Sequence, residues 1–223
     1  RKIANNIMFR TITAAITPKH PNNGSAAWVR NDSFSTRDYL CLLGVVNSLV
    51  FDYLARQKVA GLNVNAYHLL QLPVPHLPSE GIAAWHDPIV WRVFELTYCA
   101  EDLVGLAQDL GAEMSAPAIG SLPPFRWSLE RREVLRAESD AMIAQAYGLD
   151  RSDLEWVLDA QPPSESFRVL KEAEIAEYGE YRTKRLILEV YDALDEAMRN
   201  GQPYQTRLEP PPADPSCCHP PRN

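Results

Sequence analysis

The stretch from Leu42 to Pro75 constrains the fold most: an apolar helical segment, a polar link and a proline-bounded exit follow one another. Its apolar side chains recur at offsets of 4, 7, 11 and 14, as one helix face requires, at Tyr39, Leu43, Val46, Val50 and Tyr53. Ser35 or Thr36 can begin this helix and Gly61 can end it. Pro73 and Pro75 then force an extended backbone that a central strand cannot contain. We therefore expect one long packed helix with an extended exit.

The first thirty residues have the composition of strands and turns. NIMFRTITAAITP is rich in β-branched residues, HPNNGS is a turn cluster, and AAWVRND fits a second short strand. The predicted fold is therefore α+β but mostly α: a small N-terminal sheet with one long packed helix, followed by a C-terminal helical, bundle-like region.

Helical patterns dominate the rest of the chain. Asp87-Pro88 begins a predicted helix that keeps one apolar face to Gly111. A third helix is predicted with Leu135, Met142 and Ala146 on one side and its end at Gly148, and a short fourth helix begins at Ser152. The last predicted helix follows GEYRTKR, with Ile187, Tyr191, Leu194 and Met198 on one face. Seven of the 23 residues from Gly201 onward are proline, which predicts a disordered tail. We expect three parts: a first unit over 1–78, a helical region over 79–200, and a tail over 201–223.

Composition and charge narrow the class of protein. The chain has 46% hydrophobic residues, enough for a sizeable core, and no apolar run near the ~20 residues that span a bilayer. The spacing of its four cysteines suits no disulfide framework, which favours a cytoplasmic protein. Without a long apolar run, we expect no membrane partner. Net charge is −7, but residues 1–80 hold eight Lys and Arg against four Asp and Glu, and residues 81–223 hold fourteen against twenty-five. A basic first third on an acidic support is compatible with nucleic-acid binding.

The sequence contains no recognisable catalytic set. Nucleophile elbows, phosphate-binding glycine loops and zinc spacings are absent. Cys217-Cys218-His219 lacks further ligands, so a loose tail is the favoured interpretation over a metal site. Glu180 and Lys184 are better explained as a surface ion pair than as nuclease residues. We predict no catalytic, cofactor-binding or metal-binding residue in this segment, and whether it acts as an enzyme stays open.

Recognition chemistry is the remaining possibility. Base edges are contacted by Arg, Lys, Asn, Gln and Thr, with further basic groups holding phosphates. Such residues of the basic third are the predicted DNA contacts: Arg10, Thr11, Lys19, His20, Arg30, Asn31, Arg56, Lys58, Asn63 and Asn65. Each has a simpler alternative, since Arg56 and Lys58 also complement a helix dipole.

Several blocks resemble the C-terminal region of large single-chain DNA methyltransferases of restriction-modification and bacterial phage-defence systems. They are TITAAITP, LLGVVNSLVFDYLARQKVAG, LNVNAYHLLQLPVP, FRWSLERREVLRAESDAMIAQAYGLDRSDLEWVLD and EAEIAEYGEYRTKRLILEVYDAL, spanning about residues 3 to 195. The helix-to-LPVP element is also similar to each half of a type I restriction specificity subunit.

This resemblance implies a parent protein that methylates adenine N6 with S-adenosylmethionine, while this segment serves as part of a target-recognition domain. The expected partners are double-stranded DNA and an upstream catalytic domain of the same protein. No position here matches the family's catalytic loop or cofactor motif: Asp87-Pro88 is followed by Ile89, not by Pro and an aromatic residue. The part before the first helix is short, so we expect much of the recognition domain upstream of Arg1. The alternative is a helical protein-interaction or assembly module, favoured by the acidic helical majority. GEYRTKR is the one basic cluster of that part; a solvated helix start is favoured there over a phosphate contact.

Overall fold

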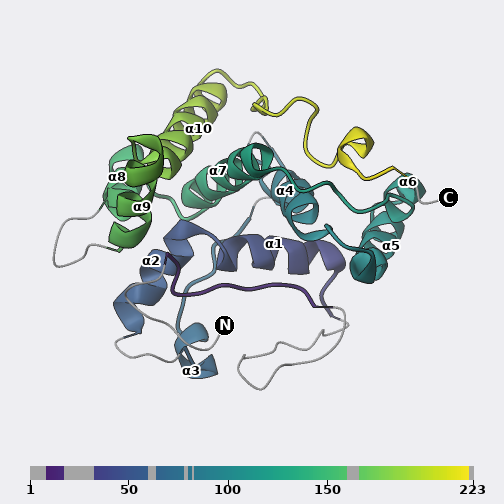
Figure 1. The fold of residues 1–223 in the computed structure, drawn as a ribbon, viewed down its shortest axis with the longest axis horizontal. Coiled ribbons are helices and arrows are strands. Elements are labelled where there is room, and N and C mark those ends of the chain that lie inside the picture. The colour runs from purple at the N-terminus through teal and green to yellow at the C-terminus, as the bar shows by residue number, and fades with distance from the viewer. Residues whose placement is uncertain are drawn as a thin grey trace.

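Helices make up all the regular structure that can be described, apart from one β-bridge between Phe125 and Cys218 (Figure 1). The computed structural model describes residues 9–17, 33–59, 64–77, 80, 81, 83–159 and 166–220. The α-helices over these ranges are α1 Thr36–Val46, α2 Leu49–Lys58, α3 Ala66–Leu69, α4 His86–Thr97, α5 Val104–Glu113, α6 Pro117–Gly120, α7 Leu129–Ala146, α8 Arg151–Asp159, α9 Arg168–Tyr178 and α10 Arg182–Arg199. The 3₁₀ turns are η1 Glu101–Leu103 and η2 Pro215–Cys217. The predicted α+β class is therefore wrong: the described part is all-α, with no strand or sheet.

The predicted first strand is instead an extended segment held by helical side chains. Residues 9–17 run beside α1 in Figure 1. The amide of Asn47 accepts from Ala14 N at 2.9 Å and donates to Ala14 O at 3.0 Å, as a neighbouring strand would. Asp52 accepts from the backbone N–H of Thr11 and of Ile12, both at 2.7 Å. Extended backbone needs partners for these groups, and here side chains supply them.

The predicted long helix is two helices, α1 and α2, bent by 62°. The stripe of apolar residues continues across the bend, but Ser48 ends one helix and caps the next. Its hydroxyl accepts from Phe51 N at 3.2 Å and donates to Val45 O at 2.7 Å. Asp140 of α7 accepts from Leu49 N at 2.6 Å, which satisfies another free N–H of the new helix start. Periodicity alone could not reveal a break that depends on a residue far along the chain.

The core is a stack of helices that pass from α1 through α4 and α7 to α10. The predicted last helix is α10, which begins at Arg182 within the GEYRTKR stretch. Ile187, Tyr191 and Leu194 are buried on one face as expected, whereas Met198, predicted on the same face, is exposed. Phe94, Tyr98 and Phe125 form an aromatic cluster with ring centroids 5.4 to 6.2 Å apart. Close approach of α1 to α4 requires Gly44, where an added Cβ would lie 2.9 Å from Val93 Cγ2.

Two further helix predictions need correction. The single helix expected up to Gly111 ends at Thr97, and the chain turns through η1 before α5 begins. Tyr98 at this turn is fully buried and donates its hydroxyl to Leu122 O at 2.8 Å, so packing interrupts the helix. Helix α9 was not predicted at all. It carries no fully buried residue.

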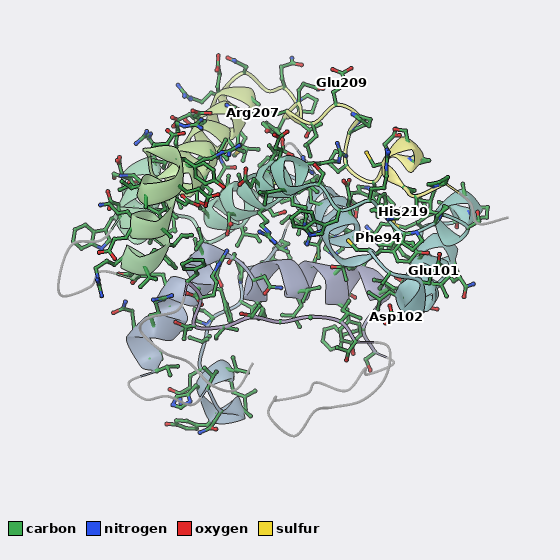
Figure 2. The ribbon with its side chains drawn as sticks, in the orientation of Figure 1. Phe94, Glu101, Asp102, Arg207, Glu209 and His219 are labelled. Atoms are coloured by element: carbon green, nitrogen blue, oxygen red, sulfur yellow. The ribbon has the colours of Figure 1, made fainter. Side chains whose placement is uncertain are left out.

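The C-terminal segment is ordered over residues 201–220, contrary to the expected disordered tail. It crosses α10, α7 and α4 and ends near α6 (Figure 1). Figure 2 shows Arg207, Glu209 and His219 along this path. Arg131 donates to Pro210 O at 2.7 Å and to Pro211 O at 2.9 Å, while Leu208, Ala213, Cys217 and Cys218 are buried. The prolines keep this segment extended, and arginines bind its carbonyls. We call residues 201–220 the C-terminal strap.

Among the described residues, no single helix is long and apolar enough to cross a membrane. The bent pair α1 and α2 would meet that requirement together, by length and composition only.

Candidate nucleic-acid interface

A polar and aromatic edge is exposed where α2 ends and α3 begins. We define the α2–α3 edge as the exposed residues Gln57, Lys58, Asn65, Tyr67, Leu70 and Gln71. Buried Val64 and Leu72 anchor the short α3 on both sides. Asn65 precedes the helix, and its N–H donates to His68 Nδ1 at 3.2 Å. This local structure presents amide, ammonium and aromatic groups together without burying any of them.

The electrostatic character of this edge differs from that of the rest of the chain. Residues 53–79 contain no Asp or Glu, although the chain has 29 of them. Helix α8 packs against α2, but its Glu155 and Asp159 are both ion-paired to Lys184, at 3.0 Å each. Glu101 and Asp102 lie at the opposite end of the molecule in Figure 2. The edge is therefore a place where a polyanion meets little repulsion.

The ten predicted DNA contacts divide into three groups. Lys19, His20, Arg30, Asn31 and Asn63 lie outside the described residues. Lys58 and Asn65 are exposed on the α2–α3 edge. Arg56 lies in the last turn of α2 but is half-buried, and Arg10 and Thr11 belong to the extended segment 9–17.

Arg56 and Thr11 hold the extended segment on α2. Arg56 Nε lies 2.9 Å from Asp52 Oδ2, and its Nη2 donates to Phe9 O at 3.0 Å. The guanidinium also lies 5.1 Å from the centroid of the Phe167 ring. Thr11 is buried, with its N–H bound to Asp52. These contacts give both residues a structural role in this arrangement.

Arg10 lines a second feature, a half-open cavity of about 560 Å³, together with three arginines that the sequence pattern does not assign to it. These are Arg132 and Arg136 of α7 and Arg182 of α10. One signal was available, because Arg132 and Arg136 are spaced by one helical turn and so share a face. Arg182 belongs to the GEYRTKR cluster, whose Arg185 is bound to Glu180 and Glu189 at 2.8 and 2.9 Å.

The other candidate sites are structural. Cys217 and Cys218 are buried free thiols, and burial raises the pKa of Cys218 to about 11. Within the described ranges, no group of three or more His, Cys, Asp or Glu side chains is placed to hold a metal ion. Lys184 pairs with α8 and not with Glu180, so the proposed surface pair is replaced by two inter-helix ones.

Comparisons with protein-family models, with curated proteins and with solved structures give no match to this chain.

Proposed function

We propose that this chain is the C-terminal part of a DNA adenine methyltransferase and contributes DNA binding, with the α2–α3 edge in contact with the duplex. The observation that carries the proposal is the run over residues 53–79, which contains no carboxylate and includes the exposed α2–α3 edge. The chain as a whole has a net charge of −7. Its place agrees with the helix-to-LPVP block that resembles restriction-modification proteins. Catalysis, with S-adenosylmethionine, belongs to the upstream domain under this proposal.

The side chains of the edge suit this task. Lys58 extends from the last turn of α2 as a mobile cation for a phosphate, and Asn65, Gln57 and Gln71 carry amides that can bond to base edges or to phosphates. Tyr67 is 71% exposed, which leaves its hydroxyl and ring free for backbone contacts. The structure-bound Arg56 fixes α2 beneath these groups.

A protein-binding module is the second candidate, favoured by apolar exposure on the same edge. Leu70 is 87% exposed and Val74 is 55% exposed. Apolar side chains gathered in this way are typical of contacts with another protein domain, here the upstream catalytic domain. Leu70→Ser separates the two functions, because it removes apolar surface without changing charge. Under the DNA proposal, this variant binds DNA within about twofold of the unaltered chain, since phosphate contacts dominate the affinity.

The direct test is duplex DNA binding by fluorescence anisotropy at 50 and 200 mM salt. We expect affinity that falls steeply with salt, and a loss of about tenfold at low salt for Lys58→Glu, because one phosphate contact becomes a repulsion. Arg199→Glu is the matched control: it changes the net charge equally at the exposed end of α10, where Arg199 forms an exposed ion pair with Asp195.

Two outcomes contradict the proposal. One is an affinity that does not depend on salt. The other is an equal loss in Arg199→Glu and Lys58→Glu, which would mean that only the overall charge matters.

A further inference from the structure

The half-open cavity has the size of a small-molecule site, and Arg136 in its lining is exposed to solvent. Its volume of about 560 Å³ falls within the roughly 300–1,000 Å³ of ligand pockets. It lies between the extended segment 9–16 and helices α1, α4, α7, α9 and α10. One wall is apolar, with Leu43, Val93 and Ile143, and the other carries arginines.

Positive charge in this cavity exceeds what the protein neutralises. Four arginines line it against three carboxylates, Glu133, Asp140 and Glu174. Glu133 pairs with Arg182 at 2.9 Å, while Glu174 and Asp140 accept from the backbone N–H of Thr183 and Leu49. Over the described residues, no carboxylate forms an ion pair with Arg10, Arg132 or Arg136. Desolvation, followed by the charges of Arg132 and Arg10, lowers the pKa of Arg136.

Several hydrogen-bond donors around the cavity are buried without acceptors. In the described part of the chain these include Arg10 Nη1 and Arg132 Nε, although the two Nη atoms of Arg132 donate to Cys99 Sγ and Leu96 O. The hydroxyl of Tyr181, outside the cavity lining, is also buried without a partner; burial and the charge of Glu174 raise its pKa, while the charge of Arg10 lowers it. A buried donor without a partner costs about 1–3 kcal/mol, so such groups are rare unless something binds them. The two guanidinium donors of Arg10 and Arg132, beside Arg136, match an anion with several oxygen acceptors.

Aromatic rings lie beside two of these arginines, although neither ring lines the cavity itself. The guanidinium of Arg132 lies 5.9 Å from the ring centroid of Trp127, and that of Arg182 lies 5.1 Å from Tyr178. Trp127 is 64% exposed and Tyr178 is 38% exposed, so both rings have surface free for another planar group. Arginine beside an aromatic ring is the arrangement that holds the phosphate and base of a nucleotide.

From this combination we propose that the cavity binds a nucleoside phosphate. Arg10, Arg132 and Arg136 hold the phosphate, and the base packs on the apolar wall. A free mononucleotide and a nucleotide unit of single-stranded DNA offer the same chemistry. This site is separate from the α2–α3 edge and does not depend on the duplex-binding proposal.

The test is to titrate the full chain with AMP, adenosine, inorganic phosphate and a short single-stranded oligonucleotide. Binding is measured by calorimetry and by the change in tryptophan fluorescence. We expect AMP to bind at least tenfold more tightly than adenosine, because only AMP carries the phosphate. Arg136→Ala weakens AMP binding at least tenfold, and Arg136→Lys restores part of it. Arg136 has no ion pair to lose, so both variants should keep the unfolding temperature of the unaltered chain.

The outcomes separate the two ligand sources and the two proposals. Tighter binding of the oligonucleotide than of AMP assigns the site to single strands, and the reverse assigns it to free nucleotides. Lys58→Glu should leave AMP binding unchanged, since Lys58 is not part of the cavity. Binding of AMP that is equal in Arg136→Ala and the unaltered chain, or absent from both, overturns the inference.

Discussion

At the scale of single residues, Asp52 connects the extended segment 9–17 to helix α2. Its side chain is completely buried and accepts from two backbone N–H groups of the extended segment and from Arg56. The sequence shows the spacing of Asp52 and Arg56, four residues apart on one helix, but not the segment 40 residues away that completes the set. The sequence therefore predicts Arg56 as a DNA contact, although the structure binds it to Asp52 and Phe9. Lys58 and Asn65 are exposed.

Asp52→Ala should destabilise the fold by about 3–5 kcal/mol, because it leaves a half-buried guanidinium and two backbone donors without their acceptor. Chemical unfolding followed by circular dichroism measures this change. Asp52→Asn keeps an oxygen for the two N–H groups and should lose less. The matched control is Asp195→Ala, which breaks only an exposed pair with Arg199 and should have little effect. Equal losses for Asp52→Ala and Asp195→Ala would contradict this role.

At the scale of elements, apolar periodicity predicts the long helix α10 well, because that helix buries one face. Helix α7 is buried on all sides over residues 137–144, so its apolar pattern indicates only part of what it buries. Periodicity fails where contacts between distant parts of the chain determine the local structure. The α1–α2 bend depends on Asp140, and the segment 9–17 has strand-like composition but meets the side chain of Asn47 where a strand would be. β-branched composition indicates an extended backbone, and here no neighbouring strand completes a sheet. In the same way, no sequence pattern predicts that Arg10 and Arg136, which belong to separate elements, line the same cavity.

Helices α5 and α6 approach each other through a pair of glycines, which gives a prediction for this element. An added Cβ at Gly111 would lie 2.6 Å from Gly120 N and 2.9 Å from Gly120 Cα. Since backbone atoms cannot rotate away, Gly111→Ala should cost about 1–3 kcal/mol despite its better helix propensity. In Gly120→Ala the nearest atom is Gln108 Cα at 3.4 Å, so stability should stay within about 1 kcal/mol. Thermal unfolding of both variants checks the difference, and a Gly111→Ala chain as stable as Gly120→Ala would refute the close approach.

At the scale of the whole molecule, the C-terminal strap connects helices that are far apart in sequence. Glu138 of α7 is fully buried and bound to Arg92 of α4 at 2.7 Å. The strap completes its shell, since Tyr204 Oη, Thr206 Oγ1 and Arg207 N all donate to it at 2.8 to 2.9 Å. Proline content suggested a loose tail because composition reports only the intrinsic preference of the chain. The buried carboxylate that orders it lies more than 60 residues earlier.

Removal of residues 201–223 should therefore destabilise the helical stack and not merely shorten the chain. Glu138 would keep Arg92 but lose three donors, and Glu95 would lose the N–H of Ala213. Hydrogen bonds to a buried charge contribute about 1.5–3 kcal/mol each, so we expect a total loss of several kcal/mol and an unfolding temperature lower by roughly 10 °C. Thr206→Val, which removes one donor, should lower it by part of this amount, and exposed Thr17→Val should not. A truncated chain that unfolds within about 1 °C of the full chain would mean that the strap rests on the surface without stabilising α4 and α7.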